Sequence, residues 1–359
     1  MHVMGGGDVG GAKTQIMNTV TGLSRTNDVM LISFRAGPFA DEARERGIDV
    51  RVIERHNPFR AARTMRDLVD EFKPDIIHCH GGRANLMGAM VRRSRRIPII
   101  TTVHSDYRLD YLGSPLKQHT LGTANAIALR FLDFYQPVAD RMARTLIERG
   151  FDPERIVKIY NGMEFNRPEG EFDRAAYLRE TYGAEIEEGD VLCGIAARLT
   201  AVKDIATTVR GFAEALKTAP QLRLFIAGDG EDADMLKKLC DQLGVRERVT
   251  FCGWVSPVMP FFRAMNINLL SSVSETFPYS ILEGVCAGCA TICSDVGGMP
   301  ELIDTGENGY IFPVGDDKKL AEYMARLAND AALRHTFAEA LYAKASRDFS
   351  KDKMCERQE

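Results

Sequence analysis

The chain has 359 residues, of which 45% are hydrophobic and 27% charged, and its formal net charge is −4. This composition excludes a disordered or fibrous chain, and the length suits two domains better than a single core. No apolar run reaches the roughly 18 residues of a membrane-spanning helix, and the start MHVMGGGDVGG lacks the pattern of a signal peptide. Eight scattered cysteines are typical of a reduced protein, so we expect a cytoplasmic location.

The charge is distributed unevenly along the chain. Residues 1–160 carry 24 Lys and Arg against 18 Asp and Glu, a net charge of +6, and the remainder carries 22 against 32, a net charge of −10. A basic half favours an anionic partner, such as a phosphate-bearing substrate or a membrane surface. Two solvated surfaces of different composition explain the asymmetry equally well, and both interpretations stay open.

Short β-branched runs alternate with amphipathic helical stretches from one end of the chain to the other. This alternation predicts parallel sheets with helices on both faces. Ten or more strands in two groups predict an α/β protein of two Rossmann-like, doubly wound domains, with a junction near residues 159–165. In chain order the expected strands are 29–34, 49–53, 75–80, 98–104, 135–139, 191–197, 222–228, 248–253, 267–272 and 289–294.

Open α/β sheets bind ligands outside the carboxyl ends of their strands, so the loops that follow the strands are the first candidates. After the first strand comes GGGDVGGAKTQ, residues 5–15, a glycine-rich loop that opens a helix and suits phosphate. It matches neither the dinucleotide fingerprint nor the P-loop. A tight turn without a ligand is the alternative.

A pair of cations follows the strand at 191–197. Arg198 and Lys203 stand five residues apart before a helix start, where a guanidinium fork and a point charge can hold a diphosphate from one side. Two basic residues in a loop are more often simply solvated, so this pair alone does not define a site.

The stretch SETFPYSILEG, residues 274–284, contains two carboxylates. Pro278 is tolerated only in the first turn of a helix, so we expect Glu275 in a loop and Glu283 inside a helix that begins near Ser280. Carboxylates accept hydrogen bonds from hydroxyls, and the N–H groups of the first turn donate to hydroxyls or phosphate. A ligand with hydroxyls at both ends and a diphosphate between them is a nucleotide sugar.

These stretches, taken together, resemble a known family. The chain is similar to the retaining glycosyltransferases of family 4 (glycosyl transferases group 1), which have the GT-B fold of two Rossmann-like domains with a cleft between them. The matching motifs run in the order of the family over essentially the whole chain, and the last is the most specific. They are DVGGAKTQ, DIIHCHG, TTVHSD, IYNGME, AARLTAVKD, IAGDGED, FCGWV and SETFPYSILEGVCAGCATICSDVGGMPELI.

The resemblance implies three segments. Residues 1–163 would form an acceptor-side domain, residues 164–343 a nucleotide-sugar-binding domain, and residues 344–359 a helix that returns toward the first domain. Two departures from the family pattern are a first strand a few residues shorter and a final helix that looks cut short, and either end could reflect truncation.

The resemblance also implies a role for each motif residue of the second domain. Arg198 and Lys203 would hold the donor diphosphate, and Glu283 would accept hydrogen bonds from the ribose. Glu275 would lie at the transferred sugar. Further donor contacts are expected from the main chain of the turn and from a loop residue beside the base: Phe277, Pro278, Tyr279 and Val255.

In the first domain the resemblance implies fewer contacts. Gly10 and Gly11 would approach the diphosphate, and His104 would line the sugar pocket near the reacting carbon. The short motif HCH at residues 78–80 places two histidines on one face of a strand. For these two histidines we expect no metal-binding role.

The implied reaction is that of a retaining hexosyltransferase. It would move a sugar from a nucleotide sugar, most simply a UDP-sugar, to a hydroxyl of a sugar or lipid-linked sugar acceptor, in the synthesis of cell-envelope polysaccharide, exopolysaccharide or glycolipid. Members of this family are thought to use front-face substitution, in which the leaving diphosphate helps to deprotonate the acceptor. No cofactor, no metal ion and no nucleic acid is expected.

Two functions other than sugar transfer stay open from the sequence, and so does the role of one arginine run. An epimerase of the same fold would convert the donor without an acceptor. A nucleotide-sugar-binding module would not need His104 and both glutamates. The arginine run at residues 92–96 either contacts anionic lipid, as a peripheral membrane protein would, or is solvated.

Overall fold

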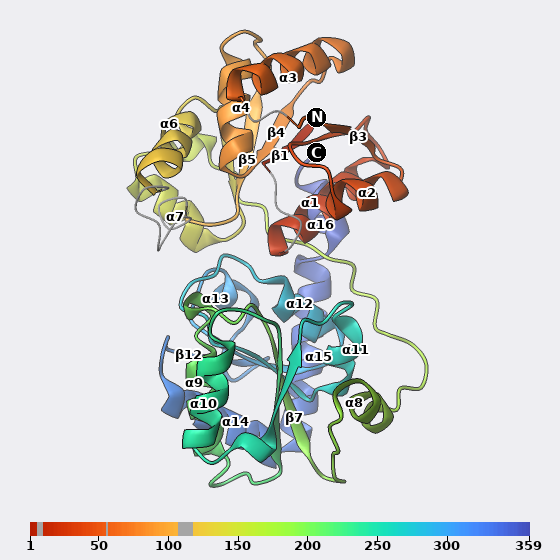
Figure 1. The fold of residues 1–359 in the computed structure, drawn as a ribbon, viewed down its shortest axis with the longest axis vertical. Coiled ribbons are helices and arrows are strands. Elements are labelled where there is room, and N and C mark those ends of the chain that lie inside the picture. Colours follow the sequence, from red (N-terminus) through yellow and green to blue (C-terminus); the bar gives the residue numbers. More distant parts are fainter. Residues whose placement is uncertain (6–9, 55–56, 107–117) are drawn as a thin grey trace. The chain divides into compact units, whose positions relative to one another are not determined.

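The computed structural model describes residues 1–5, 10–54, 57–106 and 118–359, and it divides into two compact units. The first unit comprises Met1–Met163 together with Phe349–Glu359, and the second comprises Glu164–Asp348. Figure 1 shows both units in the colours of the sequence. Each unit is an α/β domain with its own core.

The first unit is built on a six-stranded parallel sheet in the order β3-β2-β1-β4-β5-β6. The first strand of the chain therefore lies in the interior of the sheet, and the chain winds outward from it in both directions. The strands are β1 (His2–Met4), β2 (Met30–Ser33), β3 (Asp49–Val52), β4 (Ile77–His80), β5 (Ile99–Val103) and β6 (Phe134–Pro137).

Helices cover both faces of this sheet because successive strand residues point in opposite directions. Val3 and Ile32 pack with one set of helices, and Met4 and Leu31 pack with the other. The helices are α1 (Gly11–Leu23), α2 (Pro38–Glu45), α3 (Pro58–Phe72), α4 (Gly82–Arg92), η1 (Gln118–Gly122), α6 (Thr123–Leu129), α7 (Asp140–Glu148), η2 (Pro153–Arg155) and α16 (Lys351–Glu356).

The C-terminal helix α16 packs against α1 within the first unit. A Cβ atom on Gly22 would lie 2.2 Å from Sγ of Cys355, so the two helices approach too closely for any larger residue at that position. Main-chain bonds of Met163 hold the helix in place. Its amide donates to the carbonyl of Phe349 at 3.2 Å, and its carbonyl accepts from the amide of Lys351, the first residue of α16, at 2.9 Å.

The second unit repeats the architecture with a six-stranded parallel sheet in the order β12-β11-β10-β7-β8-β9. Its first strand, β7, again lies in the interior of the sheet. The strands are β7 (Val191–Ala196), β8 (Leu222–Ala227), β9 (Val249–Gly253), β10 (Ile267–Leu270), β11 (Ala290–Ser294) and β12 (Tyr310–Phe312).

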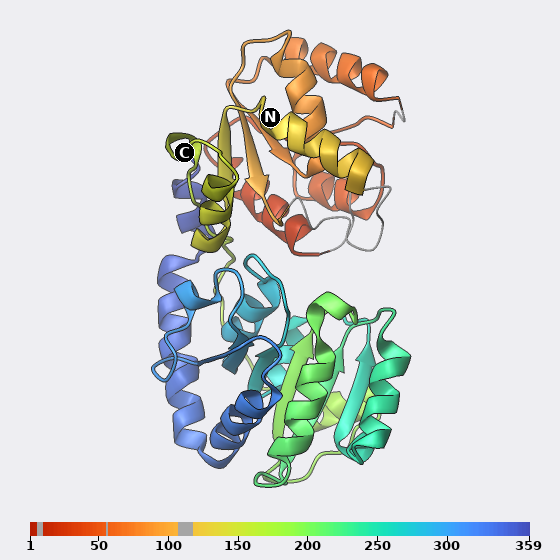
Figure 2. The ribbon, with the colours of Figure 1, turned by 90° about the vertical axis from the view of Figure 1, so that its left-hand side faces the viewer.

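Helices again cover both faces, and helices α9 and α14 pack together along one of them, as Figure 2 shows in green and blue. Cys193 of β7 points to this face, and Leu192 points to the face that carries α8 and α11. The helices are α8 (Arg174–Tyr182), η3 (Ala201–Lys203), α9 (Ile205–Ala215), α10 (Ala233–Gln242), η4 (Arg246–Arg248), α11 (Met259–Ala264), α12 (Tyr279–Cys286), α13 (Met299–Leu302), α14 (Asp317–Asn329) and α15 (Ala331–Asp348).

The predicted α/β fold of two doubly wound parallel sheets is confirmed, and all ten expected strands are present with ends shifted by one or two residues. The edge strand β12 was not predicted, because three residues of YIF are too few to give a periodic signal. The predicted boundary after residue 343 is wrong, because it falls inside α15, a continuous helix of the second unit that ends at Asp348.

Helix α12 approaches the sheet closely at Gly284, and this packing yields a first prediction. A Cβ atom there would lie 2.1 Å from Nδ2 of Asn268, whose amide donates to the carbonyl of Ser280 at 2.9 Å. Gly284→Ala is therefore expected to lower the free energy of unfolding by about 1–3 kcal/mol, measured by chemical denaturation. The control Ser280→Ala adds no atom to the same helix, and an equal midpoint for both variants would contradict the prediction.

Candidate functional site

Strand order locates the candidate site of the second unit. Strands β8 and β10 flank β7 on opposite sides, so the chain reverses its winding direction between β7 and β10. Ligands of doubly wound sheets bind at this switch point, outside the carboxyl ends of the strands. The loop after β7 carries Arg198 and Lys203, and the loop after β10 carries Glu275. The two stretches that the sequence singled out therefore follow neighbouring strands.

Lys203 and Glu275 form an ion pair at this edge of the sheet. The ammonium of Lys203 donates to Oε1 of Glu275, and the hydroxyl of Ser272 donates to the same oxygen at 2.8 Å. Their side chains are only 19% and 12% exposed. The sequence assigned the two residues to different parts of the donor, and the structure shows them in direct contact across 72 positions of the chain.

Main-chain bonds and hydroxyl groups fix the two loops against each other. Ser271 donates to the carbonyl of Lys203 at 3.1 Å, and Thr208 donates to Ser271 at 2.8 Å. The amide of Val273 donates to the carbonyl of Val202 at 2.9 Å. These bonds position the main chain on both sides of the ion pair.

A glycine pair supports the turn that carries Glu275. Gly297 has a φ of 51°, and a Cβ atom on it would lie 2.3 Å from the carbonyl oxygen of Thr276. Gly298 donates its amide to that same carbonyl at 2.7 Å. Only a residue without a side chain permits this approach. Gly297 and Gly298 therefore support the main chain next to Glu275.

The turn after Glu275 leads directly into helix α12. Pro278 is the N-cap residue, and no side chain in the described part of the chain caps the helix. Phe277 and Tyr279 are 2% and 5% exposed, so their rings belong to the interior of the second unit. The prediction that Glu275 precedes a helix and Glu283 lies inside it is confirmed, and the helix begins at Tyr279, one residue before the expected start.

Glu283 is a partly buried carboxylate on α12, and no residue in the described part of the chain donates a hydrogen bond to it. Burial raises the pKa of its carboxyl to about 7. A desolvated acceptor without a donor is unfavourable in the free protein. Two or more hydroxyl groups from a ligand would remove this penalty.

The remaining residues predicted for the second unit lie on loops at the same edge of the sheet. Arg198 is exposed in the loop after β7 and has no side-chain partner among the residues that the structure describes. Val255 is partly buried in the loop that follows β9. Gly228 and Gly230 allow the loop after β8 to approach the β7 loop, since Cβ atoms there would lie 1.8 and 2.2 Å from its carbonyl oxygens.

In the first unit the predicted residues lie at the carboxyl ends of the strands of its own sheet. Gly10 is the N-cap of α1 with a φ of 103°, which only glycine adopts without strain, and Gly11 is the first helical residue. Residues 6–9 of the glycine-rich loop lie outside the described residues. His104 follows β5 and contacts His80, at 3.4 Å between His104 Nε2 and His80 Nδ1. Burial lowers the pKa of His104 to about 4.

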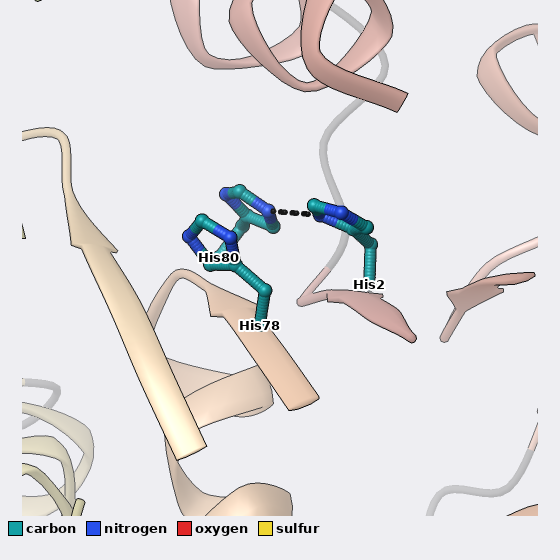
Figure 3. Close-up of side chains that lie close together, drawn as sticks. All are labelled: His2, His78 and His80. Carbon is teal, nitrogen blue, oxygen red and sulfur yellow. Dashed lines mark hydrogen bonds between the residues drawn. The ribbon is translucent and has the colours of Figure 1, made fainter. Parts of the chain in front are cut away.

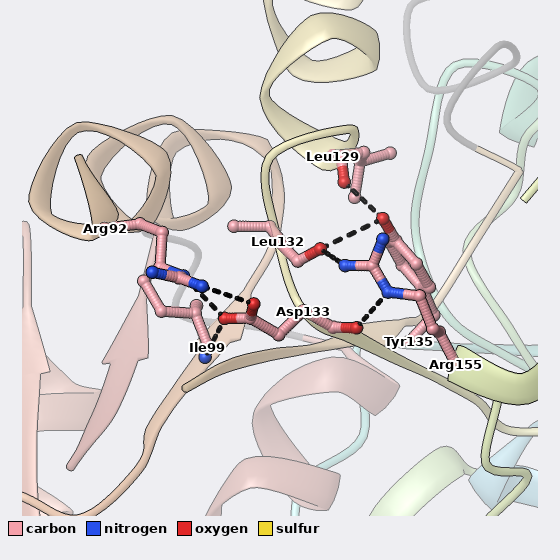
Figure 4. A network of polar contacts seen from close by, with 7 residues as sticks. All are labelled: Arg92, Ile99, Leu129, Leu132, Asp133, Tyr135 and Arg155. Atoms are coloured by element: carbon pink, nitrogen blue, oxygen red, sulfur yellow. Dashed lines mark hydrogen bonds and ion pairs between the residues drawn. The ribbon is translucent and has the colours of Figure 1, made fainter. Parts of the chain in front are cut away.

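The arginine run after α4 is only partly a free cationic surface. Arg92 forms a two-pronged ion pair with Asp133, at 2.8 and 2.9 Å, and Figure 4 shows that Asp133 also accepts from the amide of Ile99. Arg95 pairs with Asp70 in the same way. Two of the four guanidinium groups are therefore structural. In the described residues, no helix has the length and hydropathy needed to cross a bilayer.

Sequence reasoning missed the supporting residues of the site. Ser271, Ser272 and Gly297 hold Lys203 and Glu275, yet serines after a strand and glycines in a loop are common in any α/β protein. The consecutive serines at the end of β10 were the available signal. They were included in the expected strand 267–272, whereas β10 ends at Leu270.

Comparison with known protein families gives two consecutive matches that together span most of the chain. Residues 9–167 match the model described as Glycosyltransferase Family 4, and residues 183–344 match the model described as Glycosyl transferases group 1. The first match ends just after the first unit, and the second covers the sheet that carries the Lys203–Glu275 pair.

Individual proteins show the same likeness. An uncharacterized glycosyltransferase of Methanocaldococcus jannaschii is 28% identical over 73% of this chain and 68% of its own. The alpha-monoglucosyldiacylglycerol synthase of Streptococcus pneumoniae is 25% identical over 83% of this chain and 69% of its own. A crystal structure of Anabaena HepE in complex with UDP-glucose superimposes with a TM-score of 0.84 and 20% identity, covering 99% and 98% of the two chains.

Proposed function

This chain belongs to the group 1 glycosyltransferases and has their GT-B fold, and from this premise we propose that it transfers a sugar from a UDP-sugar to a hydroxyl acceptor, retains the anomeric configuration and needs no metal ion. The observation that carries the proposal is the Lys203–Glu275 ion pair at the switch point of the second sheet. It presents a cation and an acceptor carboxylate together where a nucleotide sugar offers a phosphate and sugar hydroxyls.

Three further features support a donor of this class. Glu283 lacks a hydrogen-bond donor among the described residues, and ribose hydroxyls would supply one. Arg198 has no competing partner in the described part of the chain and can take up a diphosphate. Helix α12 has no side-chain cap among the described residues, and the positive end of its dipole favours a negatively charged ligand group. The choice of uridine follows the UDP-glucose bound to the Anabaena neighbour.

Charge on the departing diphosphate is the main electrostatic demand of the reaction. Arg198 and Lys203 supply two positive charges, and the helix N-terminus adds a partial one. In the free protein Lys203 is neutralised by Glu275. We propose that the bound donor shares this lysine, so that Glu275 turns toward the sugar hydroxyls while Lys203 turns toward the phosphate.

Product stereochemistry and metal dependence test the proposal together. The product is expected to keep the anomeric configuration of the donor, and activity is expected to survive EDTA, because the protein supplies the cations itself. Proton NMR of the first-formed product reads the configuration from the anomeric coupling. An inverted coupling, or activity lost in EDTA and restored by a divalent metal, would overturn the assignment of Arg198 and Lys203.

The acceptor is proposed at the level of a class, a sugar or lipid-linked sugar in envelope polysaccharide or glycolipid synthesis. The glycolipid product named for the Streptococcus pneumoniae relative supports this class. Incubation of one UDP-sugar with and without such acceptors separates transfer from epimerisation, because an epimerase converts the donor alone. Calorimetry against UDP, GDP and ADP tests the base independently of the acceptor.

A further inference from the structure

Three buried histidines of the first unit lie close together. His2 belongs to β1, and His78 and His80 belong to the neighbouring strand β4. Figure 3 shows their rings gathered in one place, with one nitrogen of each within 4.8 Å of the others. The ring planes are nearly parallel, however, at 14°, 20° and 32° to one another, and Nδ1 of His2 forms a hydrogen bond with Nε2 of His80 at 3.2 Å. Metal ligands point to one centre from different directions, so the three rings have the geometry of a packed, hydrogen-bonded cluster rather than of a metal site.

A cavity in the second unit has a different character. It encloses about 250 Å³ between the chain that leads into α8, the helix α11 and the end of α12. Helix α11 packs against both of the other helices. Arg167, Arg174 and Arg263 line the cavity together with Phe172, and no acidic residue is among the described residues that line it. The cavity is therefore strongly cationic.

Helix α12 runs between this cavity and the candidate site. Glu275 and Pro278 lie just before its first residue, and Ala287, just after its last, lines the cavity. Strand β11 begins at Ala290, so this end of α12 lies at the amino edge of the parallel sheet, opposite the edge that carries Lys203. A helix of eight residues is about 12 Å long. The cavity and the candidate site are therefore separate places in the same unit.

Of the three arginines, one has an acidic partner in the described part of the chain. Arg167 donates to both carboxylate oxygens of Glu339, at 2.8 Å each. Its guanidinium carbon also lies 4.2 Å from the ring centre of Tyr342. These contacts hold the guanidinium in place, and the carboxylate offsets its charge.

The other two arginines have only neutral acceptors among the described residues. Arg174 donates to Oδ1 of Asn266 at 3.3 Å, and Arg263 donates to the carbonyl of Gly170 at 3.0 Å. Neither contact neutralises a charge. A guanidinium has five N–H donors, so each group keeps donors for a ligand.

A fourth guanidinium group lies near Arg174. Arg334 of α15 donates to the carbonyls of Leu327 and Ala328. Burial lowers the pKa of the Arg334 guanidinium, and the positive charge of Arg174 lowers it further. Like charges disfavour each other, most of all where water is partly excluded. An anion beside Arg174 would relieve this repulsion.

The carboxyl end of α12 offers a second explanation for nearby cations, because the last carbonyls of a helix carry a partial negative charge. In the described residues, however, Arg174 and Arg263 donate to acceptors outside α12, and neither donates to a carbonyl of that helix. Asp173, the residue before Arg174, is the N-cap of α8 and accepts from the amide of Ala176 at 2.9 Å. Capping of α12 therefore does not account for the two charges.

The chemistry of the cavity fits a small phosphate ester. A phosphate monoester carries a charge of about −1.5 to −2 at pH 7 and has three acceptor oxygens, which suit two guanidinium groups. A carboxylate ligand would neutralise only one of them. The ring of Phe172, whose centre lies 4.6 Å from the Arg263 guanidinium carbon, adds an apolar wall for the organic part.

We propose that this cavity binds a phosphate monoester, with Arg174 and Arg263 as its charged contacts. The site is additional to the candidate donor site and does not depend on the proposed sugar transfer. A soluble ester of sugar size and the headgroup of phosphatidic acid both present the required group.

Isothermal titration of the full-length chain with glycerol 3-phosphate tests the proposal, and glycerol is the neutral control. Saturable binding of the phosphate ester alone is expected, with the same affinity in the presence and in the absence of UDP. Arg174→Gln and Arg263→Gln are each expected to weaken it by roughly 10–100-fold, the loss typical of removing a hydrogen bond to a charged group. Arg179→Gln, an exposed change on the helix that carries Arg174, is the matched control and should bind as the wild type does.

Three results of this titration would overturn the proposal. They are no binding to the wild type, displacement of glycerol 3-phosphate by UDP, and an unchanged affinity in both Arg174→Gln and Arg263→Gln. Displacement by UDP would place the phosphate at the candidate site instead.

A variant that removes no arginine keeps the proposal testable if the arginine variants fail to fold. Ala287→Glu adds a carboxylate at a residue that lines the cavity. This carboxylate is expected to compete with the ligand, so the rise in the unfolding midpoint that glycerol 3-phosphate gives the wild type should disappear. An equal rise in both proteins would place the bound phosphate outside the cavity and reject the proposal.

Vesicles identify the source of the phosphate group. Co-sedimentation compares vesicles that contain phosphatidic acid with phosphatidylglycerol vesicles of equal surface charge. Binding to phosphatidic acid alone, lost in Arg263→Gln, would assign the cavity to a lipid headgroup. Binding of glycerol 3-phosphate without such vesicle binding would assign it to a soluble ester. Failure of both probes would overturn the proposal.

Discussion

Replacing Lys203 with alanine is expected to lower kcat by roughly 10²–10³-fold, the loss typical of removing one preorganised donor to developing charge. The affinity for UDP should fall by a smaller factor. Negative charge on the diphosphate grows as the glycosidic bond breaks, so the ammonium interacts more strongly with the transition state than with the ground state. Single-turnover kinetics measure the loss in the rate of transfer, and calorimetry measures the loss in UDP affinity. Equal losses would show that Lys203 contributes to UDP binding alone.

The same substitution is also expected to destabilise the free protein. Glu275 is 12% exposed, and without Lys203 its carboxylate would keep, among the residues that the structure describes, only Ser272 as a partner. Removing one member of a buried ion pair costs about 3–5 kcal/mol, although partial exposure reduces this here. The double variant Lys203→Met/Glu275→Gln removes both charges, and it should recover stability without recovering kcat.

Two control variants distinguish the losses of turnover and stability in Lys203→Ala from the general effect of removing a positive charge. Lys217 forms an ion pair with Glu214 whose side chains are 68% and 53% exposed, so Lys217→Ala should change neither stability nor turnover measurably. Arg198 has no side-chain partner in the described residues, so Arg198→Ala should lower kcat without changing the midpoint of unfolding. A large loss of stability in Arg198→Ala would indicate that the guanidinium is structural.

Replacing Glu283 with glutamine is expected to stabilise the free protein at pH 8 and to weaken nucleotide binding. Burial raises the pKa of this carboxyl from 4.5 to about 7. The folded state therefore favours the neutral form, and stability is lost as the pH rises through 7. The shift corresponds to at most roughly 3 kcal/mol at pH 8, and the difference between wild type and Glu283→Gln should vanish near pH 4.

Nucleotide binding should favour the ionised form of Glu283, whereas folding favours its neutral form. Ribose hydroxyls donate to the ionised carboxylate, so Glu283→Gln is expected to lose about 1.5–3 kcal/mol of affinity for UDP and for the UDP-sugar alike. The wild type should release a proton on binding UDP near pH 6.5, which calorimetry in buffers of different ionisation enthalpy detects. Glu322→Gln, an exposed control, should bind UDP with the same affinity and the same proton release as the wild type. Unchanged UDP affinity in Glu283→Gln would place the ribose elsewhere.

The sequence by itself determined the features that depend on neighbouring residues. Alternation of β-branched runs and amphipathic stretches indicated the two parallel sheets, because the periods of strand and helix are local properties. Pro278 located the start of α12 to within one residue, and with it the placement of Glu275 before the helix and Glu283 inside it. The rule that ligands bind at the carboxyl ends of parallel strands then selected the loops after these strands as candidates.

Only the tertiary structure decided which distant side chains meet. Lys203 and Glu275 are 72 residues apart and come together because β7 and β10 are adjacent in the sheet. His2 and His80, 78 residues apart, meet because β1 pairs with β4. Arg92 has an ion-pair partner because Asp133 immediately precedes β6. Strand adjacency and close packing at glycines such as Gly297 result from the whole fold, and no local pattern specifies them.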